Sequence, residues 1–165
     1  MNQKMRAGFT YLIEVMKDGV VIERDTVHNL LPIEGINHIL NVTMHQGTQV
    51  PTWYIGLFEG NYTPLSTDTA ATFPGFATET QTYNEGTRQA WVEGAAVSGA
   101  MDNTGNLAQF TSNALKTVYG GFISSNPVLG ATTGTLLSVV RFSSPKTFDV
   151  GTVLRVTAGF TMTSV

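Results

Sequence analysis

Hydrophobic and polar positions alternate along most of this chain, a pattern typical of β-strands. The first clear example is "FTYLIEV", in which every second residue from Phe9 to Val15 is large and apolar. A second alternating run, "VVIERDTV", follows Asp18-Gly19, a pair favoured in tight turns between antiparallel strands. The pattern therefore predicts a β-hairpin over residues 9–27.

One segment has helical spacing instead. In "HNLLPIEGINHILNVTMHQG", apolar residues recur at Ile33, Ile36, Ile39 and Leu40. Pro32 suits the first turn of a helix, and Gly47 suits a stop. We expect a helix over residues 33–45, and we expect it to be the one substantial helix of the chain.

From Trp53 onward the pattern is almost entirely that of short strands separated by Gly, Asn, Pro and Thr turns. The expected strands cover residues 52–58, 89–97, 107–113, 117–125, 135–142 and 153–165. The "DNTGN" segment supplies a turn, and Pro145 and Gly151 are expected at turns around a short strand near Phe148. This organisation predicts a mainly β protein.

At 165 residues the chain is long enough for one domain and short for two. We expect a single antiparallel β-sandwich, Ig-like or jelly-roll-like, with an N-terminal hairpin and one short helix. Residues 1–8, "MNQKMRAG", are expected to form a flexible arm that orders on a partner surface.

The segment 59–89 does not fit the strand pattern and is much longer than a usual loop. We call it the excursion. After Glu59, Asp68 is its one charge before Glu79, and large apolar side chains are spaced through it, which argues for order. They pin it either to its own sandwich or to another chain, and the expected contact residues are Tyr62, Leu65, Phe73, Phe76 and Tyr83. A helical turn is expected near "TDTAATF".

The charge content narrows the function classes. The chain has 9 Lys and Arg against 12 Asp and Glu, and 13% of its residues are charged, about half the usual share. No basic cluster suggests nucleic-acid binding, and no apolar run has the length of a membrane helix. We expect neither a nucleic-acid partner nor a membrane, and no secretory signal is recognised. A weakly charged surface suits a subunit that is packed in an assembly.

No constellation of residues identifies an enzyme. The absence of Cys excludes thiol chemistry and Cys-ligated zinc, and the Ser residues lack a nucleophile-elbow motif. His38 and His45 are seven residues apart rather than the four preferred for a helical metal site. We therefore expect no catalytic, metal-binding or cofactor-binding residue and no cofactor.

Aromatic residues leave sugar binding open as a second class of function. Trp53, Tyr54, Tyr62 and Trp91 either stack on a sugar or belong to the core, and two tryptophans on expected strands favour the core. Arg88 and Arg141 lie beside aromatic residues and are expected to stack or to pair with a carboxylate.

Several motifs resemble a family of small virion proteins of tailed bacteriophages. They are an "N-L-x-P-x-E-G-x-N-H-x-L" segment at 29–40, "T-W-Y-x-G-L-F-E-G-N-Y-T-P" at 52–64, "T-V-Y-G-G-F" at 117–122, "L-L-S-x-x-R-F" at 136–142, and a closing hairpin motif at 150–156. The likeness covers most of the chain from about residue 10.

The resemblance implies a structural virion protein. We expect a capsid decoration (cement) protein on the head surface, made in the host cytoplasm. It would contact the major capsid protein and form a homo-oligomer, with a trimer favoured because capsids offer three-fold positions. The alternative is a tail- or fibre-associated protein that binds a host receptor or glycan.

Overall fold

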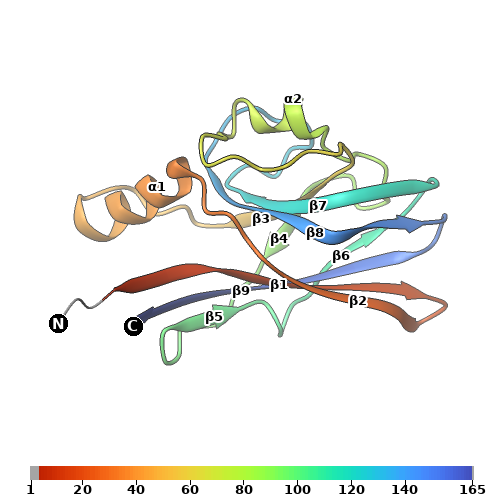
Figure 1. Cartoon of the computed structure of the whole chain (residues 1–165), viewed down its shortest axis with the longest axis horizontal. Coiled ribbons are helices and arrows are strands. Elements are labelled where there is room, and N and C mark those ends of the chain that lie inside the picture. Colours follow the sequence, from red (N-terminus) through yellow and green to blue (C-terminus); the bar gives the residue numbers. More distant parts are fainter. Residues whose placement is uncertain (1–3, 165) are drawn as a thin grey trace.

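The computed structural model describes residues 4–164 and contains two antiparallel sheets packed face to face, with two short helices (Figure 1). The prediction of a mainly β sandwich with a short helix is confirmed. The main core lies between the sheets and takes large side chains from both, including Tyr11, Ile13, Ile55, Phe110 and Val156.

The first sheet has the order β2-β1-β9-β5, with β6 also pairing with β9. Its strands are β1 (Met5–Lys17), β2 (Val20–His28), β5 (Ala100–Asp102), β6 (Ala108–Thr111) and β9 (Val153–Ser164). The second sheet has the order β4-β3-β7-β8. Its strands are β3 (Trp53–Phe58), β4 (Gln89–Trp91), β7 (Lys116–Ser124) and β8 (Leu136–Phe148).

The N-terminal hairpin forms as predicted, and β1 and β2 turn at Asp18-Gly19 with positive φ at both residues. Alternate residues of β1 from Phe9 to Val15 are buried. The prediction of a flexible arm is wrong for residues 5–8, because β1 begins at Met5 and pairs along its length with β9. Of the remaining arm residues, Lys4 is exposed and precedes β1, and residues 1–3 lie outside the described residues.

Three strand predictions need correction. The strand expected over 89–97 ends at Trp91, and β5 was not predicted. The expected turn at Pro145 is absent, because β8 runs through it to Phe148 and pairs there with Lys116 at the start of β7. A proline is tolerated here because β8 is the edge strand of its sheet.

Both helices lie outside the sheets. Helix α1 (Ile33–Met44) confirms the predicted helix, and Pro32 occupies its N-cap. Helix α2 (Phe73–Ala77) is a short turn within the excursion that begins at the last residue of the "TDTAATF" segment, near which a helical turn was expected. Figure 1 shows α1 at the end of the sandwich where the two termini lie and α2 above the second sheet.

Candidate functional site

The excursion folds back onto the second sheet and closes on itself. Backbone amides of Glu59 and Gly60 donate to the carbonyl oxygens of Thr78 and Ala77, at 2.9 and 2.8 Å. The amide of Thr80 then donates to Leu57 at 2.9 Å, which returns the chain to the end of β3. Residues 59–78 therefore form a loop whose two ends are joined by main-chain hydrogen bonds.

Phe73 fixes this loop to the sheet. Its ring is fully buried and makes edge-on contacts with Phe58 and Phe122, at centroid distances of 5.5 and 5.2 Å. The sheet makes room for these rings with glycines. A Cβ at Gly120 would lie 2.3 Å from the Phe58 ring, and one at Gly56 would lie 2.3 Å from the Phe122 ring. The loop thus has its own small core beside the main one.

Asp68, the one charged residue between Glu59 and Glu79, is buried and makes hydrogen bonds within the loop. Its carboxylate accepts hydrogen bonds from the Tyr62 hydroxyl at 2.7 Å and from the Leu65 amide at 2.8 Å. Burial, the hydrogen bond and the charge of Asp68 together raise the pKa of Tyr62 to about 12. Arg141 also holds the loop, because its guanidinium donates to the Tyr62 carbonyl oxygen at 2.6 Å and lies over the Tyr119 ring.

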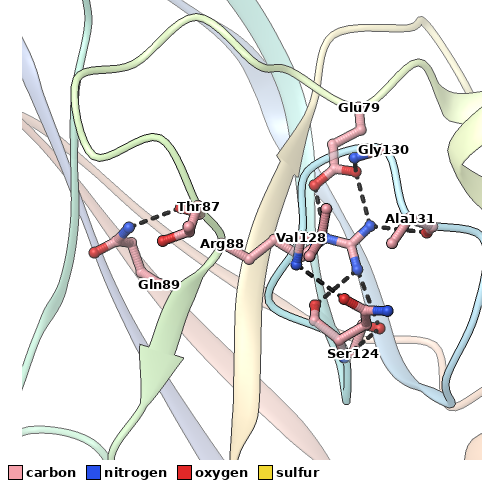
Figure 2. Close-up of polar contacts among 9 residues, drawn as sticks. Glu79, Thr87, Arg88, Gln89, Ser124, Val128, Gly130 and Ala131 are labelled. Carbon is pink, nitrogen blue, oxygen red and sulfur yellow. Dashed lines mark hydrogen bonds and ion pairs between the residues drawn. The ribbon is translucent and has the colours of Figure 1, made fainter.

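A buried ion pair begins directly after this loop in the sequence. Glu79 and Arg88 have side chains that are each 1% exposed, and two N–H groups of Arg88 donate to the two carboxylate oxygens at 2.7 and 2.8 Å (Figure 2). The remaining partners come from the β7–β8 connection. Arg88 donates to the Asn126 and Ala131 carbonyl oxygens, and Glu79 accepts from the Gly130 amide.

This pair joins the excursion to the β7–β8 connection, two segments far apart in the sequence. Arg88 also lies over the Phe122 ring at 4.9 Å, so one side chain touches both the loop core and the connection. The expectation that Arg88 and Arg141 stack or pair with a carboxylate is confirmed. Every polar side-chain atom of the pair has a partner within the chain, as buried charges require.

The second half of the excursion packs on the main core. Tyr83 is buried and meets the Phe110 ring edge-on at 5.0 Å, and burial raises the pKa of its hydroxyl. The Glu85 carboxylate accepts from the amide and hydroxyl of Thr111. The excursion is thus pinned to its own sandwich along its length.

The five predicted contact residues separate into two groups. Phe73 and Tyr83 are buried within the chain, so the prediction that they contact a partner is wrong for both. Tyr62 is partly buried on the loop core. Leu65 and Phe76 are 54% and 65% exposed, and they alone of the five are largely free to meet another molecule. The Phe76 ring stacks on Tyr62 at a centroid distance of 6.3 Å.

Helix α1 carries further exposed apolar residues that sequence reasoning did not separate from its core face. Gly35 is buried against the sheet and Ile39 packs on the main core, while Ile33, Ile36 and Leu40 are exposed. The residue that could have identified the packed face from the sequence was Gly35, because a glycine inside a helix often marks a close approach of another backbone. Three of the four residues whose spacing predicted the helix therefore point away from the core.

An apolar cleft of about 270 Å³ opens beneath α1 at the end of the sandwich. Its lining includes Phe9, His38, Trp53, Trp91, Met101 and Phe160. His38 meets the Trp53 ring edge-on at 5.1 Å, and the Trp91 indole N–H already donates to the Ala158 carbonyl oxygen at 2.8 Å. Of the four aromatic residues considered for sugar stacking, Trp53 and Trp91 meet here, whereas Tyr54 and Tyr62 do not line the cleft.

Two further features, a metal-binding cluster of side chains and a membrane-spanning helix, are absent from the described residues. Among residues 4–164, no group of three or more His, Asp or Glu side chains is placed to hold a metal ion. His28 contacts the Thr10 hydroxyl at 3.1 Å, and His38 lines the cleft. In the same part of the chain no helix has the length and apolar character needed to cross a membrane.

The chain matches no protein-family model and no curated protein.

Proposed function

We propose that this chain is a structural virion protein of a tailed bacteriophage, a decoration protein that binds the head surface through the exposed apolar residues of the excursion. The proposal combines the motif resemblance with the surface that the fold leaves open. It assigns the protein no catalytic activity and no cofactor.

The observation that carries the proposal is the lack of free charge in residues 33–78, which include α1 and most of the exposed excursion. Residues 33–78 contain no Lys or Arg and only three acids, Glu34, Glu59 and Asp68. Each acid is occupied by hydrogen bonds within the chain: Glu34 with the Ala70 and Leu136 amides, Glu59 with Lys116 and Thr80, and Asp68 with Tyr62 and Leu65. Such a face can be buried against another protein with little cost of removing charges from water.

Leu65 and Phe76 project from this face on a loop that is already ordered. Because the loop is fastened by Phe73 and the Glu79–Arg88 pair, little conformational entropy remains to be lost when it binds. Burial of each of the two side chains would contribute about 1–3 kcal/mol, scaled to the area still exposed. Repetition over many symmetric sites would turn this modest contact into strong attachment.

A tail-associated protein that binds a glycan or a receptor is the second candidate, and the cleft with Trp53 and Trp91 favours it. Glycan binding needs convergent polar groups beside an aromatic face, yet this lining is almost entirely apolar and the Trp91 N–H is occupied. The cleft therefore supports the glycan role less well than the uncharged face supports the capsid role.

Co-sedimentation with particles that lack the protein tests the proposal. Wild-type protein should sediment with capsids to a fixed ratio, and Phe76→Ser should reduce the affinity at least tenfold while the protein stays folded. Val150→Ser is the matched control, because Val150 is 69% exposed but lies on the β8–β9 turn. If wild-type protein ignores capsids and instead binds host cells or glycans, the decoration role is wrong and the tail role takes its place.

A further inference from the structure

The outward face of α1 carries an unbroken stripe of large apolar side chains. They are Ile33, Ile36, Leu40 and Met44, which are 50%, 40%, 52% and 83% exposed, and we call them the α1 stripe. Steps of three, four and four residues keep all of them on one side of a helix. The stripe lies opposite the residues with which α1 packs on the sandwich.

The helix cannot turn to bury this stripe. Gly35 lies on the packed side, and a Cβ there would be 2.4 Å from the Leu137 carbonyl oxygen and 3.0 Å from that of Leu136. Glu34 fixes the rotation as well, because its Oε2 accepts hydrogen bonds from the amides of Ala70 and Leu136 at 2.8 and 2.6 Å. The exposure of the stripe is therefore built into the way α1 docks.

The stripe belongs to a larger patch. The Ile33 amide donates to the Ser66 carbonyl oxygen at 2.9 Å, which places the exposed Leu65 segment beside the first turn of α1. The stripe alone exposes on the order of 400 Å² of apolar surface, already within the range of about 300–600 Å² seen for the largest patch on a typical monomer. With Leu65 and the flanking Asn37 and Asn41, which are also exposed, the patch reaches on the order of 600 Å² per chain, at the lower end of the range for specific interfaces.

We propose that the α1 stripe packs against the same stripe of other copies of this chain, forming a trimer with three parallel α1 helices around the symmetry axis. A second copy fits this surface because both sides are then apolar, helical and free of exposed charge. Ile33 and Ile36 occupy successive a and d positions of a heptad and Leu40 the next a position, and Ile at both kinds of position favours three or more strands over two.

This inference does not depend on the virion role. The capsid contact proposed above is tested at Phe76 on α2, whereas self-association is tested on α1. Leu65, which both proposals include, is changed in neither test. A failure of one therefore leaves a different signature from a failure of the other: lost particle binding by a trimer in the first case, and a monomer in solution in the second.

Molar mass by light scattering is the first test. Wild-type protein should have three times the 17.8 kDa of one chain, and Leu40→Glu should be a monomer with an unchanged circular dichroism spectrum. Leu115→Glu is the matched control, because Leu115 is 70% exposed on the β6–β7 connection and should leave the trimer intact. The proposal is overturned if the wild-type protein is still a monomer when its concentration is raised 100-fold above that of the first light-scattering measurement. A Leu40→Glu variant that is still a trimer would also overturn it.

Single cysteines supply a second test that does not require a destabilising charge. Because the chain has no Cys, oxidation of Ile33→Cys, Leu40→Cys or Met44→Cys reports one position at a time. Parallel helices around a three-fold axis bring each position near its own counterpart, so all three variants should form disulfide-linked pairs and Val150→Cys should not. Linkage at Leu40→Cys alone, together with a dimeric mass, would indicate antiparallel helices about a two-fold axis and would contradict the proposed trimer.

Discussion

The excursion as far as Arg88 and the helix α1 both lie outside the named strands of the two sheets, yet different contacts hold them in place. The excursion is held by a fully buried aromatic ring, an ion pair whose side chains are 1% exposed, and main-chain hydrogen bonds at both ends. Helix α1 is held by a narrow face around Gly35 and Ile39 and by one carboxylate, Glu34. Its large side chains mostly face outward.

The difference shows that apolar content alone does not distinguish an anchor from a contact. Phe73 and Phe76 are three residues apart on α2, but the first is fully buried and the second is 65% exposed. The excursion can present Phe76 rigidly because Phe73 and the Glu79–Arg88 pair already hold the excursion in its folded conformation. In α1 no comparable anchor exists apart from Glu34 and a close backbone approach, so its stripe depends more on a partner for burial.

The largest expected effect is on the buried ion pair. Arg88→Ala leaves the Glu79 carboxylate buried without its partner and removes the contact with Phe122, so the free energy of unfolding should fall by about 3–5 kcal/mol. Urea denaturation measures this loss. Lys17→Ala is the control, because the Lys17–Asp149 pair is largely exposed and should contribute less than about 1 kcal/mol. Equal losses in the two variants would show that the pair does not anchor the excursion.

The two phenylalanines of α2 should differ strongly. Phe73→Ala removes the centre of the loop core and should lower the free energy of unfolding by about 3 kcal/mol or more. Phe76→Ala removes mostly exposed surface and should change it by less than about 1 kcal/mol. Urea denaturation of both variants provides the measurement, and a large loss for Phe76→Ala would assign that residue to the core rather than to a contact.

A pair of glycines tests how closely α1 docks. Gly35→Ala forces a methyl group against the Leu137 carbonyl oxygen and should lower the free energy of unfolding by about 1–3 kcal/mol despite the higher helix propensity of Ala. Gly75 in α2 has no atom within 4 Å of the added Cβ, so Gly75→Ala should be neutral or stabilise by up to about 1 kcal/mol. Thermal denaturation compares the two, and a stabilised Gly35→Ala variant would contradict the close approach.

The smallest expected effect is the pH dependence contributed by Glu14 on β1. The hydrogen bond from Arg24, opposed by burial and aided by Arg155, lowers the pKa of Glu14 below its ordinary 4.5. A lowered pKa in the folded state means that the contribution to stability is present above about pH 5 and is lost as the pH falls through the folded value. Glu14→Gln should therefore flatten the decline of stability between about pH 5 and pH 3. An unchanged pH profile would show that Glu14 contributes nothing to it.

The strands and α1 were predictable because their signals are local. Alternation from Phe9 to Val15 and the Asp18-Gly19 turn were enough for the hairpin, and period-3.6 spacing was enough for α1. Local signals failed where pairing decided the outcome. The first strand extends to Met5 because β9 pairs with it there, and β8 passes through Pro145 because an edge position tolerates the missing N–H.

By itself, the sequence determined a mainly β sandwich with one short helix, a long ordered excursion, and a chain without cysteine chemistry. Only the tertiary structure decided which apolar residues are anchors and which are surface. Phe73 is buried because Gly120 and Gly56 open space for its neighbours, and Ile36 is exposed because Gly35 must face the Leu137 carbonyl oxygen. Such choices depend on contacts between distant segments, and the spacing of residues within one segment does not encode them.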